Sequence, residues 1–314
     1  FKMYLLHLDK NHDYLISKLD EIGFKNDIDL ISNKTEIEKK IHKYSGLIIR
    51  SRIPIDDTFI KKATNLKFIA RVGSGLENID IQSAKTNNIE VISAGEANAN
   101  AVGEHIIGLL FSLINKINIS SIQVRKGIWK REQNRGFEIE GKTVGIIGFG
   151  KTGKSFAKKL TGFNCDVLYY DTKNIPSEYN ATPVDLKLLK EKSDIISIHT
   201  DYNESSHNII NSEFINSCSK NFVLINSARG LCVNSKDLVY GIKSGKITGA
   251  CLDVLDFEES SFENVSSDES FEFLKNSNSV IMTPHVAGWT AESKLKLSSV
   301  IVEKIISLFY NHRT

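Results

Sequence analysis

The sequence is short of cysteine and proline, with four of each in 314 residues. Its cysteines are scattered and form no C-x-x-C pair, which argues against the usual zinc sites and against the disulfide frameworks of small secreted proteins. We therefore expect no metal, and reduced thiols packed inside a cytoplasmic protein. The four are Cys165, Cys218, Cys232 and Cys251.

An excess of charge and a long apolar run are also lacking. The 40 basic and 38 acidic side chains give a formal net charge of +2, so nothing indicates binding to nucleic acid or to an acidic membrane surface. The apolar run Ile106–Ile114 has polar flanks and falls short of the roughly 20 residues that span a bilayer. We expect a small-molecule partner instead.

Short apolar runs alternate with helical patterns along most of the chain. In the first third, this alternation predicts strands at 3–8, 45–51, 66–73 and 89–94. A long helix is predicted at Asn98–Asn118 and a final amphipathic helix at 290–311. Between them, a second alternating unit predicts strands at 143–149, 166–171, 194–200, 222–228, 247–254 and 279–285. Such alternation indicates an α/β fold with two doubly wound parallel-sheet domains.

Three glycines, Gly148, Gly150 and Gly153, lie where the strand at 143–149 joins a helical pattern. In that context G-x-G-x-x-G is typical of a Rossmann domain: the glycines allow a tight turn, a close approach to a pyrophosphate and close helix–strand packing. The next strand ends in Asp171, which can accept both hydroxyls of an adenine ribose and repels a 2′-phosphate. The alternative is a plain strand–turn–helix in which Asp171 caps a loop.

The motif therefore predicts NAD as the cofactor. The residues expected to bind it here are Gly148, Phe149, Gly150, Lys151, Thr152, Gly153 and Asp171.

Four polar side chains, Arg229, Asp253, Glu258 and His285, follow later strands, at the edge where open parallel sheets bind ligands. Reducing a 2-oxo acid requires a fixed cation for the carboxylate, and a guanidinium suits it. The carbonyl oxygen needs a proton, which a histidine supplies near neutral pH. A carboxylate beside the ring favours its protonated form. Taken singly, each side chain also has a plain alternative, as a surface ion pair, a satisfied histidine or a solvated acid.

Six stretches together resemble the D-isomer-specific 2-hydroxyacid dehydrogenase family over nearly the whole chain. They are ARVGSGLENID (70–80), ANANAVGEH (97–105), GKTVGIIGFGKTG (141–153), INSARG (225–230), SGKITGACLDV (244–254) and TPHVAGWT (283–290). The resemblance implies a flavodoxin-like substrate-binding domain made of residues 1–97 and 286–314. A Rossmann NAD-binding domain, residues 98–285, would be inserted in it.

The resemblance also implies roles for individual residues. Arg229 would bind the substrate carboxylate and carbonyl, His285 would be the acid/base, and Glu258 would pair with it. The amides of Ser74 and Gly75 would hold the carboxylate. Asp253 would lie near the nicotinamide end of the cofactor. Further cofactor contacts are expected from His199, Thr200, Ser227 and Ala228.

Family members are usually dimers through the nucleotide domain, so we expect a homodimer in which the Asn98–Asn118 helix and an arm around Trp129 take part. Two departures from the family pattern are visible. Glu259 and Ser260 follow Glu258, where proline is common, and the chain reads HTD at 199–201 where HTP is common. Neither removes a catalytic side chain.

Three arginines bear on the substrate. Arg50 and Arg52 follow a predicted buried strand with their side chains on one side, and Arg71 ends the next. A phosphate at the far end of a three-carbon acid would use them. Within the family, the chain most resembles members that act on 3-phosphoglycerate, in the short form without an appended regulatory domain. Alternatively, two of the arginines pair with acids such as Asp56 or Asp57.

We therefore expect conversion of 3-phospho-D-glycerate to 3-phosphooxypyruvate, the first step of serine biosynthesis. One alternative is a reductase of an unphosphorylated 2-oxo acid, of the glyoxylate/hydroxypyruvate, 2-oxoglutarate or D-lactate type. Another is a non-catalytic NAD-sensing protein resembling the transcriptional corepressors that share this fold.

Overall fold

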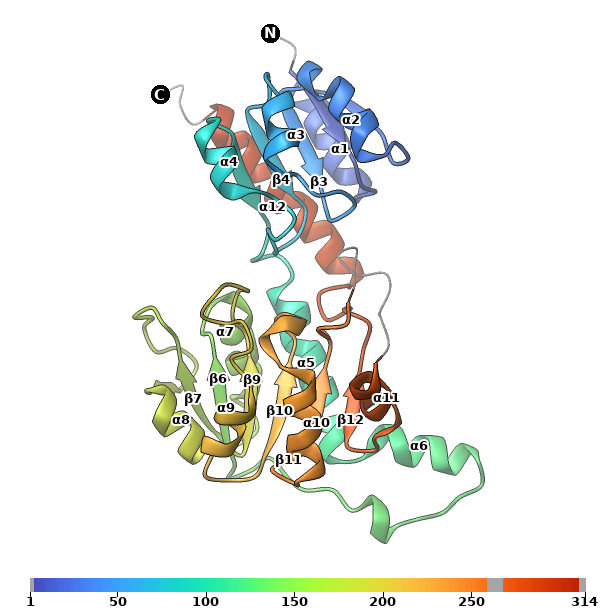
Figure 1. Ribbon diagram of the computed structural model, residues 1–314, viewed down its shortest axis with the longest axis vertical. Coiled ribbons are helices and arrows are strands. Elements are labelled where there is room, and N and C mark those ends of the chain that lie inside the picture. Colours follow the sequence, from blue (N-terminus) through green and yellow to red (C-terminus); the bar gives the residue numbers. More distant parts are fainter. Residues whose placement is uncertain (1–2, 259–267, 311–314) are drawn as a thin grey trace. The chain divides into compact units, whose positions relative to one another are not determined.

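The structure is a computed structural model that describes residues 3–258 and 268–310. It divides into two compact units (Figure 1). Unit 1 comprises the described parts of 1–98 and 289–314, and unit 2 comprises those of 99–288. The sequence placed these boundaries at 1–97 with 286–314, and at 98–285. The predicted α/β class is confirmed by two parallel sheets with alternating helices.

Unit 1 contains a sheet of five parallel strands in the order β2-β1-β3-β4-β5, a flavodoxin-like order. The strands are β1 Tyr4–His7, β2 Lys25–Ile28, β3 Gly46–Ile49, β4 Phe68–Arg71 and β5 Glu90–Ser93. The helices are α1 Asp13–Glu21, α2 Lys34–Lys40, α3 Asp57–Lys62, α4 Ile81–Thr86 and α12 Ala291–Tyr310, with a 3₁₀ turn η1 at Ile41–Lys43. The edge strand β2 was not predicted from the sequence.

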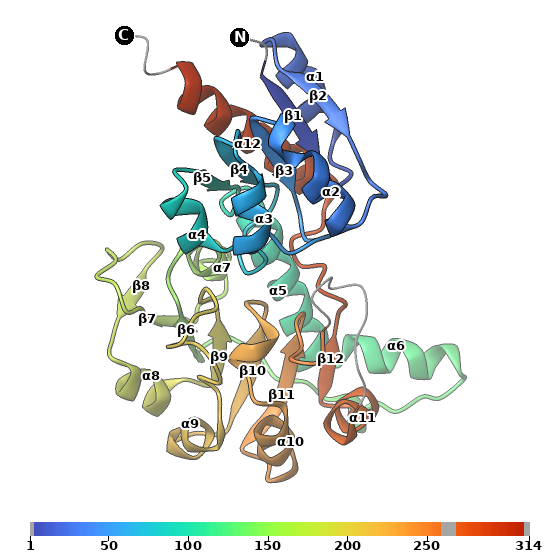
Figure 2. The ribbon, with the colours of Figure 1, turned by 45° about the horizontal axis from the view of Figure 1, so that its top comes forward.

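The last helix, α12, completes unit 1 although it is far from the other elements in sequence. Its residues Leu297 and Ile301 lie in the same buried cluster as Leu5 of β1 and Leu15 of α1. Residues that alternate with these along the strands, such as Leu6, face a second cluster on the other side of the sheet. Figure 2 shows α12 running beside this sheet. The strand-and-helix pattern alone did not indicate this return; the family resemblance implied it.

Unit 2 contains a sheet of seven parallel strands in the order β12-β11-β10-β9-β6-β7-β8. The strands are β6 Thr143–Ile147, β7 Asp166–Tyr170, β8 Ala181–Pro183, β9 Ile195–Ile198, β10 Phe222–Asn226, β11 Ile247–Leu252 and β12 Val280–Met282. The chain order reverses between β6 and β9, and ligands of open α/β sheets bind at the carboxyl ends of the strands beside such a switch point. Edge strand β8 was also missed.

The helices of unit 2 cover both faces of this sheet, and each face has its own buried cluster. They are α5 Ala99–Ile114, α6 Ile117–Arg125, α7 Lys151–Leu160, α8 Leu186–Lys192, α9 Ser212–Ser217, α10 Ser235–Lys243 and α11 Glu269–Asn276, with 3₁₀ turns η2 Glu132–Asn134 and η3 Gly230–Cys232. All four cysteines are free, and only Cys165 is not fully buried. They are packing thiols, as the sequence indicated.

The predicted long helix Asn98–Asn118 is in fact two helices, α5 and α6, with a 61° bend between them. Lys116, at the break, has a left-handed backbone with φ of 51°, which a continuous right-handed helix does not allow. No residue of α6 is buried, and Trp129 beyond it is 77% exposed. Among the described residues, no single helix is long and apolar enough to cross a membrane, although the bent pair passes by length and composition.

His199, which follows β9, predicts how stability depends on pH. Burial lowers the pKa of this imidazole to about 3, whereas an unfolded histidine titrates near about 6.5. Below about 6.5 the unfolded chain therefore binds a proton that the native state does not, so stability falls as the pH drops towards about 3. We expect thermal unfolding of His199→Gln to depend less on pH between about 6.5 and 4 than that of the wild type.

The matched control is His207→Gln, which alters an exposed histidine of the same unit. Its melting temperature should follow the wild-type pH profile. Equal slopes for the wild type and His199→Gln would contradict the assignment.

Candidate active site

The glycine loop between β6 and α7 has the shape that a dinucleotide phosphate requires. Gly148 has a φ of 91°, which favours glycine, and a Cβ there would lie 2.7 Å from the carbonyl carbon of His199. A Cβ on Gly153 would lie 2.2 Å from the Gly148 oxygen, so helix and strand approach closely. A Cβ on Gly150, the residue that precedes α7, would have no neighbour within 4 Å. The loop therefore leaves room above the helix N-terminus for a pyrophosphate.

Asp171, directly after β7, ties this loop to the next strand. One carboxylate oxygen accepts from the Phe149 amide at 2.7 Å and the other from the Lys173 amide at 2.9 Å. The loop-capping role weighed from the sequence is therefore present. It does not exclude ribose binding, because each carboxylate oxygen has a second acceptor position. Phe149 is itself fixed, stacked on Tyr169 with ring centroids 3.8 Å apart.

In unit 2, two buried polar atoms near the strand ends lack a hydrogen-bond partner within the described part of the chain. They are His199 Nδ1 and Ser227 Oγ; the other ring nitrogen of His199 lies 2.9 Å from Ser197 Oγ. Buried polar groups are rarely left unpaired. Both residues were predicted to contact the cofactor, so these two atoms, together with the glycine loop, fit NAD.

Arg229 follows β10, and its backbone is held in the loop that leaves the sheet. Asn226 Nδ2 donates to the Arg229 carbonyl at 3.0 Å, and Arg229 Nη1 donates to the Ala228 carbonyl at 2.7 Å. The next residue, Gly230, packs so closely that a Cβ would lie 2.0 Å from the Leu255 carbonyl oxygen. Arg229 is thus fixed beside the segment that leads from β11 to Glu258.

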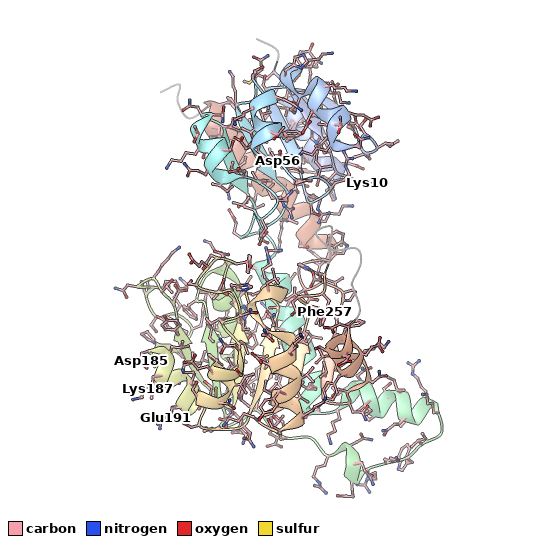
Figure 3. The ribbon with its side chains drawn as sticks, in the orientation of Figure 1. Lys10, Asp56, Asp185, Lys187, Glu191 and Phe257 are labelled. Atoms are coloured by element: carbon pink, nitrogen blue, oxygen red, sulfur yellow. The ribbon has the colours of Figure 1, made fainter. Side chains whose placement is uncertain are left out.

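Glu258 and His285, separated by 27 residues in sequence, are in direct contact. Glu258 Oε2 lies 2.7 Å from His285 Nδ1, and Oε1 accepts from the Leu255 amide at 2.6 Å. The side chains are 15% and 27% exposed, respectively. Phe257, labelled in Figure 3, anchors the neighbouring position by an edge contact with Phe271 at 5.8 Å. The departure noted at Glu259 and Ser260 lies outside the described residues.

Asp253 holds the segment that carries His285. Its carboxylate is 2% exposed and accepts from the Thr283 hydroxyl at 2.6 Å and from the Val286 and Ala287 amides, each at 2.9 Å. Burial raises the pKa of this carboxyl, but hydrogen bonds from His105, Thr283 and the two amides outweigh burial, so the pKa lies below its usual value. Between these anchors, His285 adopts a left-handed backbone with φ of 54°.

His105 of α5 is a contributor that sequence reasoning did not single out. Its Nε2 lies 3.0 Å from Thr283 Oγ1 and 3.5 Å from Asp253 Oδ1. The motif ANANAVGEH was noted for its resemblance to the family, but nothing in the sequence indicated that its last residue meets Asp253.

The predicted substrate residues of unit 1 differ in their surroundings. Ser74 is exposed and Gly75 half-buried, and the Ser74 hydroxyl accepts from Asn98 Nδ2 at 3.2 Å. Arg71 is buried; its Nη1 donates to the Val72 carbonyl at 3.3 Å and would lie 2.4 Å from a Cβ on Gly73. Arg52 donates from Nε, Nη1 and Nη2 to the carbonyls of Leu8, Ser32 and Asp29, at 2.6, 2.6 and 2.8 Å.

These contacts correct the expectation that three arginines surround one phosphate. Arg52 joins loops of its own domain because three of its donors are taken by carbonyl oxygens, and Arg71 lies beneath the Gly73 backbone. The two acids named as examples in the alternative have other partners: Asp56 (Figure 3) binds Lys34 and caps α3, and Asp57 binds Lys61 and the Ser83 hydroxyl. Of the three arginines, Arg50 remains the candidate for binding a phosphate.

No group of three or more His, Cys, Asp or Glu side chains within residues 3–258 and 268–310 could hold a metal ion. The groups that unit 2 offers for chemistry are the contact pair of His285 and Glu258, the guanidinium of Arg229 after β10, and the nucleotide-binding loop.

Comparison with known proteins supports the assignment of a nucleotide-binding domain to unit 2. The family model described as "D-isomer specific 2-hydroxyacid dehydrogenase, NAD binding domain" matches residues 107–287. A hydroxypyruvate reductase of Thermotoga maritima is 33% identical over 95% of this chain and 94% of its own length. A D-3-phosphoglycerate dehydrogenase of Archaeoglobus fulgidus is 32% identical over 91% of this chain, which spans only 53% of that protein.

Among solved structures, an acyclic imino acid reductase in complex with NADPH and D-Arg superposes with a TM-score of 0.87. It is 27% identical, and the match covers 98% of both chains. The family model, the full-length relative and the nucleotide-binding loop agree, and the chain belongs to the D-isomer specific 2-hydroxyacid dehydrogenase family, with an NAD-binding domain in unit 2.

Proposed function

We propose that this NAD-dependent 2-hydroxyacid dehydrogenase interconverts 3-phospho-D-glycerate and 3-phosphooxypyruvate. The observation that carries the proposal is that the side chain of Arg50, just after β3, is partly buried without a hydrogen-bond acceptor among the described residues. A guanidinium in that state favours an anionic ligand, and phosphate suits its geometry. The relatives named as D-3-phosphoglycerate dehydrogenases support the same substrate.

In the oxidation direction, His285 removes the proton of the C2 hydroxyl at Nε2. Glu258 makes this possible because it accepts the hydrogen bond of Nδ1–H, which leaves Nε2 as the acceptor, and it stabilises the imidazolium that forms. When NAD is bound by the glycine loop, its nicotinamide would supply the acceptor for the hydride from C2. Arg229 would bind the carboxylate and the oxygen that becomes the carbonyl, and the roles implied for the amides of Ser74 and Gly75 stay predictions. The glycine loop and Asp171 hold the pyrophosphate and the adenine ribose.

A second candidate is reduction of hydroxypyruvate or glyoxylate. It is favoured by the contacts of Arg52 and Arg71, which leave one arginine rather than three for a phosphate, and by the relative named hydroxypyruvate reductase. The two candidates differ in what Arg50 contributes, so a variant of this residue separates them.

The acid/base pair is tested first. His285→Asn keeps a side chain that tolerates the left-handed backbone but has no titrating group. We expect kcat to fall by roughly 10²–10⁴-fold, the usual contribution of general acid–base catalysis, while NADH still binds. Glu258→Gln should move the pH at which reduction fails to lower values, because the protonated ring loses its carboxylate. NADH fluorescence and pH profiles of kcat measure both effects.

The matched control is His207→Gln, which should leave kcat unchanged. An unaltered pH profile in Glu258→Gln would remove Glu258 from the pair. Wild-type protein that binds NADH but turns over no 2-oxo acid would instead support the non-catalytic alternative.

The substrate is tested by two arginine variants. Arg50→Ala should lower kcat/KM for 3-phosphoglycerate by roughly 10- to 150-fold, the equivalent of one charge-assisted hydrogen bond of about 1.5–3 kcal/mol. Reduction of glyoxylate, which has no distal anion, should change much less. Arg52→Ala should lower the melting temperature and affect both substrates equally, because its donors serve the protein. Equal losses on both substrates in Arg50→Ala would favour the unphosphorylated 2-oxo acid.

The cofactor preference is tested at Asp171. Its carboxylate would meet the 2′-phosphate of NADP as a like charge, so we expect higher kcat/KM with NAD. In Asp171→Asn, which keeps an acceptor for the Phe149 amide, kcat/KM with NADP should rise by about tenfold or more. Wild-type protein that uses the two cofactors equally would show that Asp171 does not discriminate. That outcome is a real alternative, because the imino acid reductase binds NADPH.

A further inference from the structure

Arg50 lies against an aromatic ring that no part of the proposed mechanism uses. The guanidinium carbon is 4.3 Å from the ring centroid of Trp289, well within the range of a cation–π interaction. Both residues belong to unit 1. The Arg50 backbone is fixed as well: its amide donates to Asp9 Oδ2 at 2.6 Å and its carbonyl accepts from Asn78 Nδ2 at 3.2 Å. The hydrogen-bonded backbone of Arg50 and the indole of Trp289 together set the position of the guanidinium.

Trp289 is held in place by the start of α12. The next residue, Thr290, exchanges hydrogen bonds with Ser293: the Thr290 amide donates to Ser293 Oγ, and the Ser293 amide donates to Thr290 Oγ1, both at 3.0 Å. This reciprocal cap fixes the chain direction at the helix N-terminus. Trp289 is nevertheless 67% exposed, so core packing does not explain a tryptophan here.

A stacked arginine keeps its hydrogen-bonding capacity. The indole interacts with the face of the guanidinium, whereas all five N–H donors lie in its plane and point away from the ring. Burial lowers the pKa of Arg50, and the nearby Asp9 raises it only in part, so the cation is incompletely solvated and gains from an anion. Fixing it beforehand reduces the ordering cost of binding.

We propose that Trp289 is a positioning residue whose indole face holds the Arg50 guanidinium ready for the anionic far end of the substrate. This inference rests on the proposed function for the identity of the substrate. On this proposal, Trp289 affects binding of the anionic far end of the substrate and has no effect on proton or hydride transfer.

Two variants of similar bulk test it. Trp289→Leu removes the aromatic face, and Trp289→Phe keeps one. We expect Trp289→Leu to raise KM for 3-phosphoglycerate by about 3- to 30-fold, the usual range of a cation–π contact, with kcat and the reduction of glyoxylate unchanged. Trp289→Phe should retain most of the wild-type KM. In an Arg50→Ala background, Trp289→Leu should have no further effect. A wild-type KM in Trp289→Leu, or equal losses on glyoxylate, would overturn the proposal.

A binding measurement separates this inference from the substrate assignment. The chain has two tryptophans, so in a Trp129→Phe background the emission reports on Trp289 alone. Titration with inorganic phosphate should change that emission, and the change should disappear in Arg50→Gln. If 3-phosphoglycerate is not turned over but this response is present, the substrate assignment fails and the positioning role stands. No response to phosphate overturns the positioning role.

Discussion

The buried carboxylate of Asp253 is the constraint on which the site depends. A charge that is 2% exposed is stable only when it is well paired, and its partners are the hydroxyl and amides on either side of His285. The same contacts hold His285 in a left-handed backbone, which costs free energy unless the surroundings enforce it. The electrostatic requirement of one buried group thus fixes the direction of the imidazole towards Glu258.

Local patterns identified most of unit 2 because its chemistry is arranged along the chain. The glycine motif follows a strand and begins a helix within a few residues, so its physical role could be read directly. The same is true of residues at strand ends, where the parallel order of the sheet brings Arg229, Glu258 and His285 to one edge. Strands β2 and β8 were not predicted because they are short edge strands with mostly exposed residues, and they lack the apolar run that indicates burial.

The roles of the arginines could not be read from the sequence. Arg50 and Arg52 share one side of a short segment, but the acceptors of Arg52 are carbonyls 20 to 44 residues away, whereas Arg50 meets Trp289, 239 positions later. Spacing cannot reveal such contacts because they depend on how the loops of unit 1 fold. The break at Lys116 is similar: a left-handed lysine leaves no signal in apolar periodicity. The homodimer and the cytoplasmic location stay predictions.

One measurement tests the central claim most directly: formation of NADH by the purified chain from NAD and a panel of D- and L-2-hydroxy acids. The account predicts NADH with D-isomers only, with the highest kcat/KM for 3-phospho-D-glycerate. Absence of NADH with every acid, under conditions where the protein binds NAD, would contradict it, since the His285–Glu258 pair would then be a structural contact on a non-catalytic nucleotide-binding domain.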